Sequence, residues 1–204
     1  TLGTGDDTVN TGADADTVIA GANLTANDVL DGGLDANLLR VNAGSVDNNY
    51  LNVDNFQTLQ IDTSGNTVLG ANAQAAGIRT INETLAGGIA GVIDASAYTA
   101  DIRVNLNLLT GDIGNDTVMT GSGNDTIQIG QDLVNLSSGE GDDTFIVHDG
   151  YITINESIDG GLGNDTVNGG SGDASLYGDG EGGTGDAALY GLAPNSGPTT
   201  GQAP

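Results

Sequence analysis

Residues 111–146 read GDIGNDTVM, TGSGNDTIQ, IGQDLVNLS and SGEGDDTFI, which are four consecutive units of nine residues with no gap between them. The same unit opens the chain as LGTGDDTVN and TGADADTVI over residues 2–19, and it returns as GGLGNDTVN and GGSGDASLY over residues 160–177. A further unit, GGTGDAALY, covers residues 182–190 after a four-residue insert. Because so short a unit cannot bury an apolar face alone, its repetition in phase predicts a solenoid of stacked repeats.

Each position of the unit suits a turn that is followed by a short strand. The glycines permit the positive φ angles of a tight turn, and the Thr and Val that follow favour a strand. The apolar eighth position is expected to point inward and to build a narrow core ladder, which consists of Val9, Val18, Val118, Ile127, Leu136, Phe145 and Val167.

The aspartate at the sixth position brings a hard oxygen ligand to each turn. Turn carbonyls add more oxygens, and calcium takes six to eight of them. Two stacked carboxylates about 4–5 Å apart would repel each other by roughly 3–4 kcal/mol at an effective dielectric near 20, so a cation between them is expected. The alternative interpretation is that the Gly-Asp turns only separate the strands of a metal-free solenoid.

This unit resembles the RTX (repeats-in-toxin) nonapeptide, G-G-x-G-x-D-x-U-x, in which U is a large apolar residue. The resemblance covers about half of the chain. It implies an all-β fold, a parallel β-solenoid or β-roll in which two nonapeptides complete one coil, and it implies several bound Ca²⁺ ions. It also implies secretion, of the type I kind, to the extracellular surface of a bacterium.

Alternate units of such a roll face the same side, so ligand partners lie two units apart. One side of the second array then carries an unbroken ladder of Asp125, Asp143 and Asp165. These are the first candidate metal ligands, and the turns that hold them contribute Gly121, Gly123, Gly139, Gly141, Gly161 and Gly163.

The opposite side of the second array carries Asp116, then Val134, Glu156 and Ala174, so its acidic ladder is interrupted. In the first array Asp7 is expected to stack on Asp28 and Asp16 on Asn37. Asp116, Asp7, Asp28 and Asp16 are therefore further candidate ligands. Asn37 can ligate through its amide oxygen, but without charge.

The composition shifts along the chain predict four segments. Residues 1–40 and 109–191 are RTX β-roll repeats, and residues 192–204 hold all three prolines and are interpreted as a linker or an arm. Residues 41–108 lack the nonapeptide but contain short β-type runs at 58–61, 79–82, 91–94 and 102–105. We expect this middle segment to be a calcium-free solenoid with longer coils that continues its neighbours; an independent sandwich is the alternative.

Charge and composition exclude several classes of protein. The 204 residues include 28 Asp and Glu but only 3 Lys and Arg, which gives a formal net charge of −25. Such a chain offers no basic surface for nucleic acid or for an anionic membrane. It has no cysteine and no run of 18 apolar residues, so we expect neither disulfides nor a transmembrane segment. Because the chain starts at Thr1 without a visible signal peptide, we expect a fragment or a processed product.

Catalytic motifs are not evident, so we predict that the chain is not an enzyme. His148 is the only histidine, which excludes an H-E-x-x-H zinc site. No G-x-S-x-G turn occurs near it. Aspartate pairs of the kind that glycosidases use are abundant, but every conspicuous pair lies in a repeat turn.

Two functions remain from the sequence. The first is a calcium-dependent structural protein, as a segment or subunit of a bacterial S-layer or a similar surface assembly. The second is the stalk or passenger region of a secreted RTX adhesin, with a cell-surface glycan as a candidate partner. The 3% aromatic content favours the first, because carbohydrate-binding faces usually present Tyr or Trp. We expect self-assembly, or assembly with flanking domains, when calcium is present, and we expect both repeat arrays to unfold without it.

Overall fold

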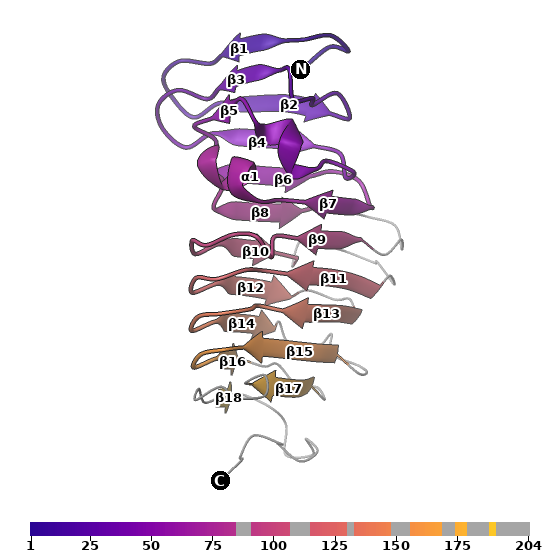
Figure 1. The fold of residues 1–204 in the computed structure, drawn as a ribbon, viewed down its shortest axis with the longest axis vertical. Helices are drawn as coiled ribbons and strands as arrows, with labels where there is room; N and C mark the ends of the chain where they lie inside the picture. The colour runs from indigo at the N-terminus through magenta and orange to yellow at the C-terminus, as the bar shows by residue number, and fades with distance from the viewer. Residues whose placement is uncertain are drawn as a thin grey trace.

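Parallel strands stacked as rungs along one axis make up the computed structural model of this protein (Figure 1). It describes residues 1–84, 91–106, 115–129, 133–147, 156–168, 174–178 and 188–190. Every strand pair between these residues is parallel, and strands of one sheet alternate along the chain with strands of another. This arrangement is an all-β parallel solenoid, which confirms the fold class that the repeats predict.

The rungs form three sheets. The longest contains β2 (Thr17–Gly21), β4 (Leu38–Val41), β6 (Thr58–Ile61), β8 (Thr80–Glu83), β10 (Arg103–Asn105), β12 (Thr126–Ile129), β14 (Thr144–Val147), β16 (Thr166–Asn168) and β18 (Ala188–Tyr190). The second contains β7 (Asn66–Val68), β9 (Val92–Asp94), β11 (Asn115–Met119), β13 (Leu133–Ser137), β15 (Glu156–Gly161) and β17 (Ala174–Gly178). The third contains β1 (Thr8–Asn10), β3 (Val29–Asp31) and β5 (Val53–Asp54).

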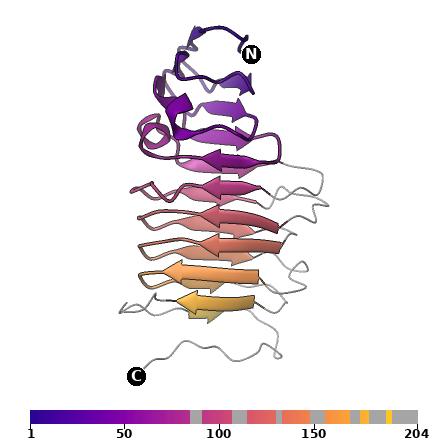
Figure 2. The same ribbon diagram turned by 45° about the vertical axis from the view of Figure 1, so that its right-hand side comes forward.

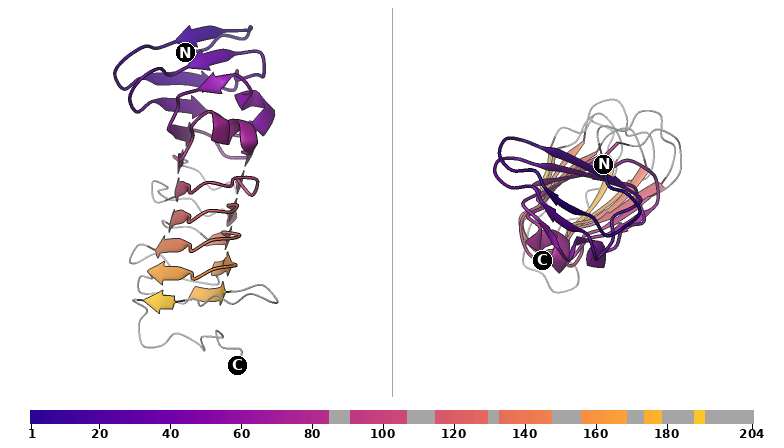
Figure 3. Two further views of the ribbon diagram at one scale, coloured as in Figure 1. Left: turned by 60° about the vertical axis from the view of Figure 1, so that its left-hand side comes forward. Right: turned by 90° about the horizontal axis from the view of Figure 1, so that it is seen from above.

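Coil length varies along the stack. The coil between Asp125 and Asp143 spans 18 residues, which equals two nonapeptides, and the next one to Asp165 spans 22. The coil from Asp16 to Asn37 spans 21 residues and the coil that ends at Asp125 spans 23. Seen end on, the described parts of the coils nevertheless overlie one another around a shared interior (Figure 3).

The strands of the longest sheet from β2 to β16 each contribute a buried apolar residue to this interior. The register stacks Val18, Leu39, Leu59, Ile81, Val104, Ile127, Phe145 and Val167 in one file, and all of them are buried. On the second sheet Val118, Leu136 and Ile158 form the matching file. Six of the seven residues predicted for the core ladder are buried, and the seventh, Val9, is partly buried beside the first coil.

The middle segment continues the solenoid. Strands β6, β8 and β10 pair with one another and with β4 and β12 on either side, which excludes an independent sandwich. Its four predicted β runs correspond to β6, β8, β9 and β10. Two helical turns, η1 (Asp47–Tyr50) and α1 (Ala71–Ala75), lie together on one side of the stack (Figure 2).

The core of this middle segment is wider than a ladder of aliphatic residues. Tyr50, Phe56 and Tyr98 are fully buried there, although the low aromatic content of the chain predicts a thin core of Val, Ile and Leu. The longer coils and the two helical turns create the room that these rings fill.

Several predictions concern residues outside the described ranges. They include the arm at 192–204, His148, and the turns of the last two repeat units. The boundaries of the four segments stay predictions. No helix within the described part of the chain is long and apolar enough to span a membrane.

Candidate metal-binding turns

The turns that enter the longest sheet place one residue per coil at the same point. Each of these residues directly precedes a strand, so the strand register stacks them in one column, which we name the turn file. From the N-terminal end the turn file consists of Asp16, Asn37, Gln57, Arg79, Ile102, Asp125, Asp143 and Asp165.

The aspartates of the turn file are linked by backbone hydrogen bonds. The amide of Ile102 donates to Asp125 Oδ1 at 2.9 Å, the amide of Asp125 donates to Asp143 Oδ1 at 2.7 Å, and the amide of Asp143 donates to Asp165 Oδ1 at 3.0 Å. The three side chains are 1–2% exposed. One carboxylate oxygen of each aspartate therefore holds the preceding coil in register.

The second carboxylate oxygen of these aspartates faces a different environment. The Oδ2 atoms of Asp125 and Asp143 are buried and accept no hydrogen bond. A buried oxygen that carries charge and lacks a donor is costly. These oxygens therefore need a proton or a cation.

The pKa of Asp143 also indicates that its carboxylate requires a proton or a cation. Burial, with a smaller contribution from the charges of Asp125 and Asp165, raises the pKa of this carboxyl to about 7 against hydrogen bonds that lower it. Burial also raises the pKa of Asp125. Bound Ca²⁺ would supply the missing positive charge, and hard carboxylate and carbonyl oxygens are the ligands that it prefers. The residues present fit a calcium ion.

Side chains alone do not complete such a site. Among the described residues, no group of three or more His, Asp or Glu side chains converges on one point. A calcium ion that takes six to eight oxygens would need turn carbonyls in addition to the aspartates.

The turn glycines allow consecutive turns to stack closely. Gly139 and Gly161 have φ angles of +92° and +72°, and a Cβ on Gly161 would overlap the carbonyl oxygen of Gly139. The amides of Glu140 and Leu162 donate to the carbonyls of Gly121 and Gly139 at 2.9 and 2.7 Å. Gly123, Gly141 and Gly163 also have positive φ angles. All six predicted glycines thus lie in the stacked turns, and their part in metal binding stays a prediction.

A row of hydroxyl groups in the same turns was missed by the sequence interpretation. Thr11 Oγ1 donates to the carbonyl of Gly32 at 2.8 Å, Thr120 Oγ1 to that of Ser138 at 2.9 Å, and Ser138 Oγ to that of Gly160 at 2.9 Å. The available signal was Thr or Ser at the first position of a unit, where other units have Gly.

The opposite side of the second array has the predicted interruption in its backbone register. Asp116 pairs with Val134, and Glu156 pairs with Ala174. An aspartate in this column has no carboxylate at the same height on the next coil.

The first array contains two kinds of aspartate. Both oxygens of Asp28 are satisfied, because Oδ1 accepts from the amide of Asp7 at 2.8 Å and Oδ2 accepts from the amide and hydroxyl of Thr25 at 2.7 and 3.2 Å. Asp7 Oδ2 accepts from the amide of Gly3 at 2.9 Å. Asp16 resembles the second array instead, because its Oδ2 is buried without a hydrogen bond. Asp16 therefore has the same unpartnered oxygen as the aspartates of the second array and Asp28 does not; the metal roles of both stay predictions.

Asn37 corrects one expectation from the sequence. Its amide oxygen accepts a hydrogen bond from the amide of Asp16 at 2.9 Å. Its amide nitrogen, not its oxygen, faces the interior of the turn, where it contacts backbone carbonyls. A metal ion would meet the nitrogen, which has no lone pair to offer.

Acidification should partly replace the missing cation in the calcium-free protein. The folded pKa of Asp143, about 7, lies above its ordinary value of 3.8, so the folded state binds a proton more tightly than the unfolded chain does. Stability should therefore rise as the pH falls from about 7 toward 4. Thermal melts in calcium-free buffer at both ends of this range test the prediction. Asp143→Asn should lose that gain, and a melting temperature of the parent protein that does not rise on acidification would contradict it.

Comparison with known proteins identifies the repeat. A family model for the RTX calcium-binding nonapeptide repeat matches in four copies, at residues 2–23, 24–45, 107–128 and 154–184. The matched ranges leave out residues 129–153, although the register places Asp143 in the turn file with Asp125 and Asp165. Searches of the curated proteins and of the solved structures found no match.

Proposed function

This chain is built on RTX calcium-binding nonapeptide repeats, and we propose on that premise that it is a calcium-dependent structural protein of a bacterial surface, as a segment or subunit of an S-layer or a similar assembly. Such repeats imply calcium binding and are typical of secreted proteins. They are generally structural, and we propose no catalytic activity for this chain.

One observation carries the proposal. The turn file holds buried carboxylate oxygens without hydrogen-bond donors at Asp125 and Asp143, and burial raises the pKa of both groups. We propose that Ca²⁺ bound by Asp125, Asp143 and Asp165, together with carbonyls of the glycine turns, holds the second array in its folded form. Asp16 is the corresponding candidate in the first array.

A structural role also fits the ends of the molecule. In a solenoid the terminal coils expose strand edges that can pair with another chain. Within the described residues, the end strands β2 and β18 of the longest sheet each pair with a strand on one side only, and the amide of Leu2 donates to the carbonyl of Ile19 on β2 at 2.9 Å. A net charge of −25 opposes self-association, and each bound calcium ion reduces this charge by two.

We expect calcium to trigger assembly for this reason. Light scattering of the protein at rising calcium concentration should increase at a threshold, and chelator should reverse the increase. Sodium chloride at equal ionic strength is the control, since it screens charge without filling the sites. A species that stays strictly monomeric at high concentration and saturating calcium would contradict the prediction.

Electron microscopy distinguishes the two candidate functions. An ordered sheet or filament in native material that is lost on chelation supports the structural role. Isolated rods that bind glycans would support the stalk of a secreted RTX adhesin instead, whose calcium sites would serve to stiffen the rod.

A further inference from the structure

Two turns of the turn file have the same sequence frame but different residues at the position of the metal-binding aspartate. Residues 31–39 read DGGLDANLL and residues 159–167 read DGGLGNDTV. Their backbones agree at the third position, where Gly33 and Gly161 have φ angles of +70° and +72°, and differ at the fifth, where φ is +67° at Asp35 and +140° at Gly163. In each turn the first aspartate accepts a hydrogen bond from the amide two residues later, at 2.8 and 3.1 Å. Asn37 in the first frame therefore corresponds to Asp165 in the second.

The side-chain amide of Asn37 lies at the centre of a group of carbonyl oxygens. Its Nδ2 is 2.7 Å from the carbonyl oxygen of Gly32, 3.0 Å from that of Asn55, 3.2 Å from that of Leu34 and 3.3 Å from that of Asp35. Asn37 is 1% exposed. The reverse orientation of the amide would aim Oδ1 at these oxygens and Nδ2 at an N–H group, so the network fixes the orientation.

Several oxygens around one positive centre form the kind of environment that a hard cation takes. At Asp125 and Asp143 the corresponding atom is an oxygen, Oδ2, which is buried without a donor. We infer that the amide group of Asn37 stands in for the calcium ion, so that the repeat copy at 24–45 holds this turn without metal. The inference rests on the proposed calcium role of the aspartates in the turn file.

The next residues of the turn file also supply polar partners from the chain in place of a metal ion. The backbone N–H of Asn37 donates to Gln57 Oε1 at 2.7 Å. Arg79, two coils further on, places its guanidinium against backbone carbonyls, with Nη1 donating to Ile78 at 2.7 Å and to Gln74 at 3.0 Å. A side-chain donor is thus present at positions of the turn file where the second array has an aspartate.

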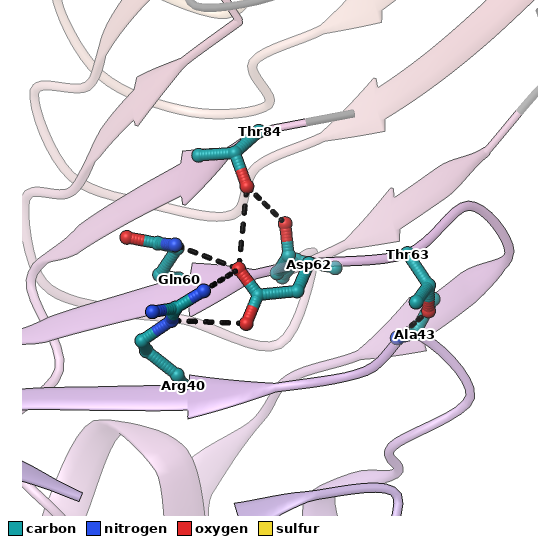
Figure 4. A network of polar contacts seen from close by, with 7 residues as sticks. Arg40, Ala43, Gln60, Asp62, Thr63 and Thr84 are labelled. Atoms are coloured by element: carbon teal, nitrogen blue, oxygen red, sulfur yellow. Dashed lines mark hydrogen bonds and ion pairs between the residues drawn. The ribbon is translucent and has the colours of Figure 1, made fainter. Parts of the chain in front are cut away.

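A carboxylate in the same coils, that of Asp62, also receives its hydrogen bonds and its positive partner from other residues of the chain. Asp62 accepts from Arg40 at 3.0 and 3.1 Å and from Gln60 at 2.6 Å, and Thr84 donates to it from the next coil (Figure 4). Burial alone would raise the pKa of Asp62, but these hydrogen bonds and the guanidinium charge lower it. Residues 31–106 therefore form a calcium-independent base on which the calcium-dependent second array stacks.

The test exchanges the two side chains between the matched frames. Asn37→Asp should bind one more calcium ion per chain than the parent protein, measured by equilibrium dialysis and metal analysis. In calcium-free buffer its melting temperature should fall by on the order of 10 °C, because a carboxylate then faces the carbonyl oxygens. Asp165→Asn should bind one ion fewer. Asn37→Ala is the matched control, which should lose calcium-free stability without gaining an ion.

The outcomes separate this inference from the proposed function. An Asn37→Asp protein with the parent's ion count and the parent's calcium-free melting temperature would overturn the role of Asn37. A parent protein that binds no calcium would overturn the proposed function, and the calcium-free melting temperature of Asn37→Asp would still decide whether its amide supports the turn.

Discussion

Removal of calcium is expected to unfold the second repeat array while the coils between about residue 31 and residue 106 stay folded. Without the ion, the buried Oδ2 atoms of Asp125 and Asp143 have no positive partner, and the cost of such groups is several kcal/mol per ion. The coils of residues 31–106 have their own donors at Asn37 and Arg79 and a core that includes Tyr50, Phe56 and Tyr98.

Circular dichroism in excess chelator measures this effect. The β signal should fall to a plateau well above that of a random chain, and millimolar calcium should restore it. This expectation is narrower than the one from the repeats alone, which has both arrays unfolding. Limited proteolysis in chelator serves as the companion measurement, with cleavage expected after residue 106 and protection of residues 31–106. A spectrum that chelator leaves unchanged would contradict the calcium-dependent fold.

Replacement of Asp143 by alanine is expected to have the largest effect of any single substitution in the turn file. Its carboxylate lies between Asp125 and Asp165, so it faces the turns of both neighbouring coils. Asp143→Ala should raise the calcium concentration at the midpoint of folding about 10- to 100-fold, which corresponds to about 1.4–3 kcal/mol.

Asp116→Ala is the matched control for this substitution. Asp116 pairs in register with Val134, so its column has no second carboxylate on the next coil. In chelator, Asp143→Ala should differ little from the parent, because the second array is expected to be unfolded in both proteins. Equal shifts of the calcium midpoint in the two variants would show that the turn file does not hold the ions.

The sequence predicts the repetitive parts of this molecule well. The nine-residue period and the apolar eighth position yield the parallel solenoid, the stacking of Asp125, Asp143 and Asp165, and the inward file from Val18 to Val167. These features follow from a local rule that each unit repeats, so one register error would have displaced them all.

The parts that the sequence does not predict depend on contacts between coils of unequal length. In the sequence, Asn37 looks like a neutral substitute for the aspartate of the repeat. Only the structure shows that its side-chain nitrogen, rather than its oxygen, contacts the carbonyls of Gly32 and Asn55. The full saturation of Asp28 depends on Thr25, which lies three residues before it in an irregular turn. The aromatic core of the middle segment depends in the same way on coils that no longer follow the nonapeptide.

The most direct measurement is a crystal structure of the protein grown with calcium, with an anomalous difference map that locates the ions. The account predicts peaks beside Oδ2 of Asp125 and Asp143 and no peak within the turn of Asn37. Either the lack of peaks at these two aspartates or an ion bound in the Asn37 turn would contradict it.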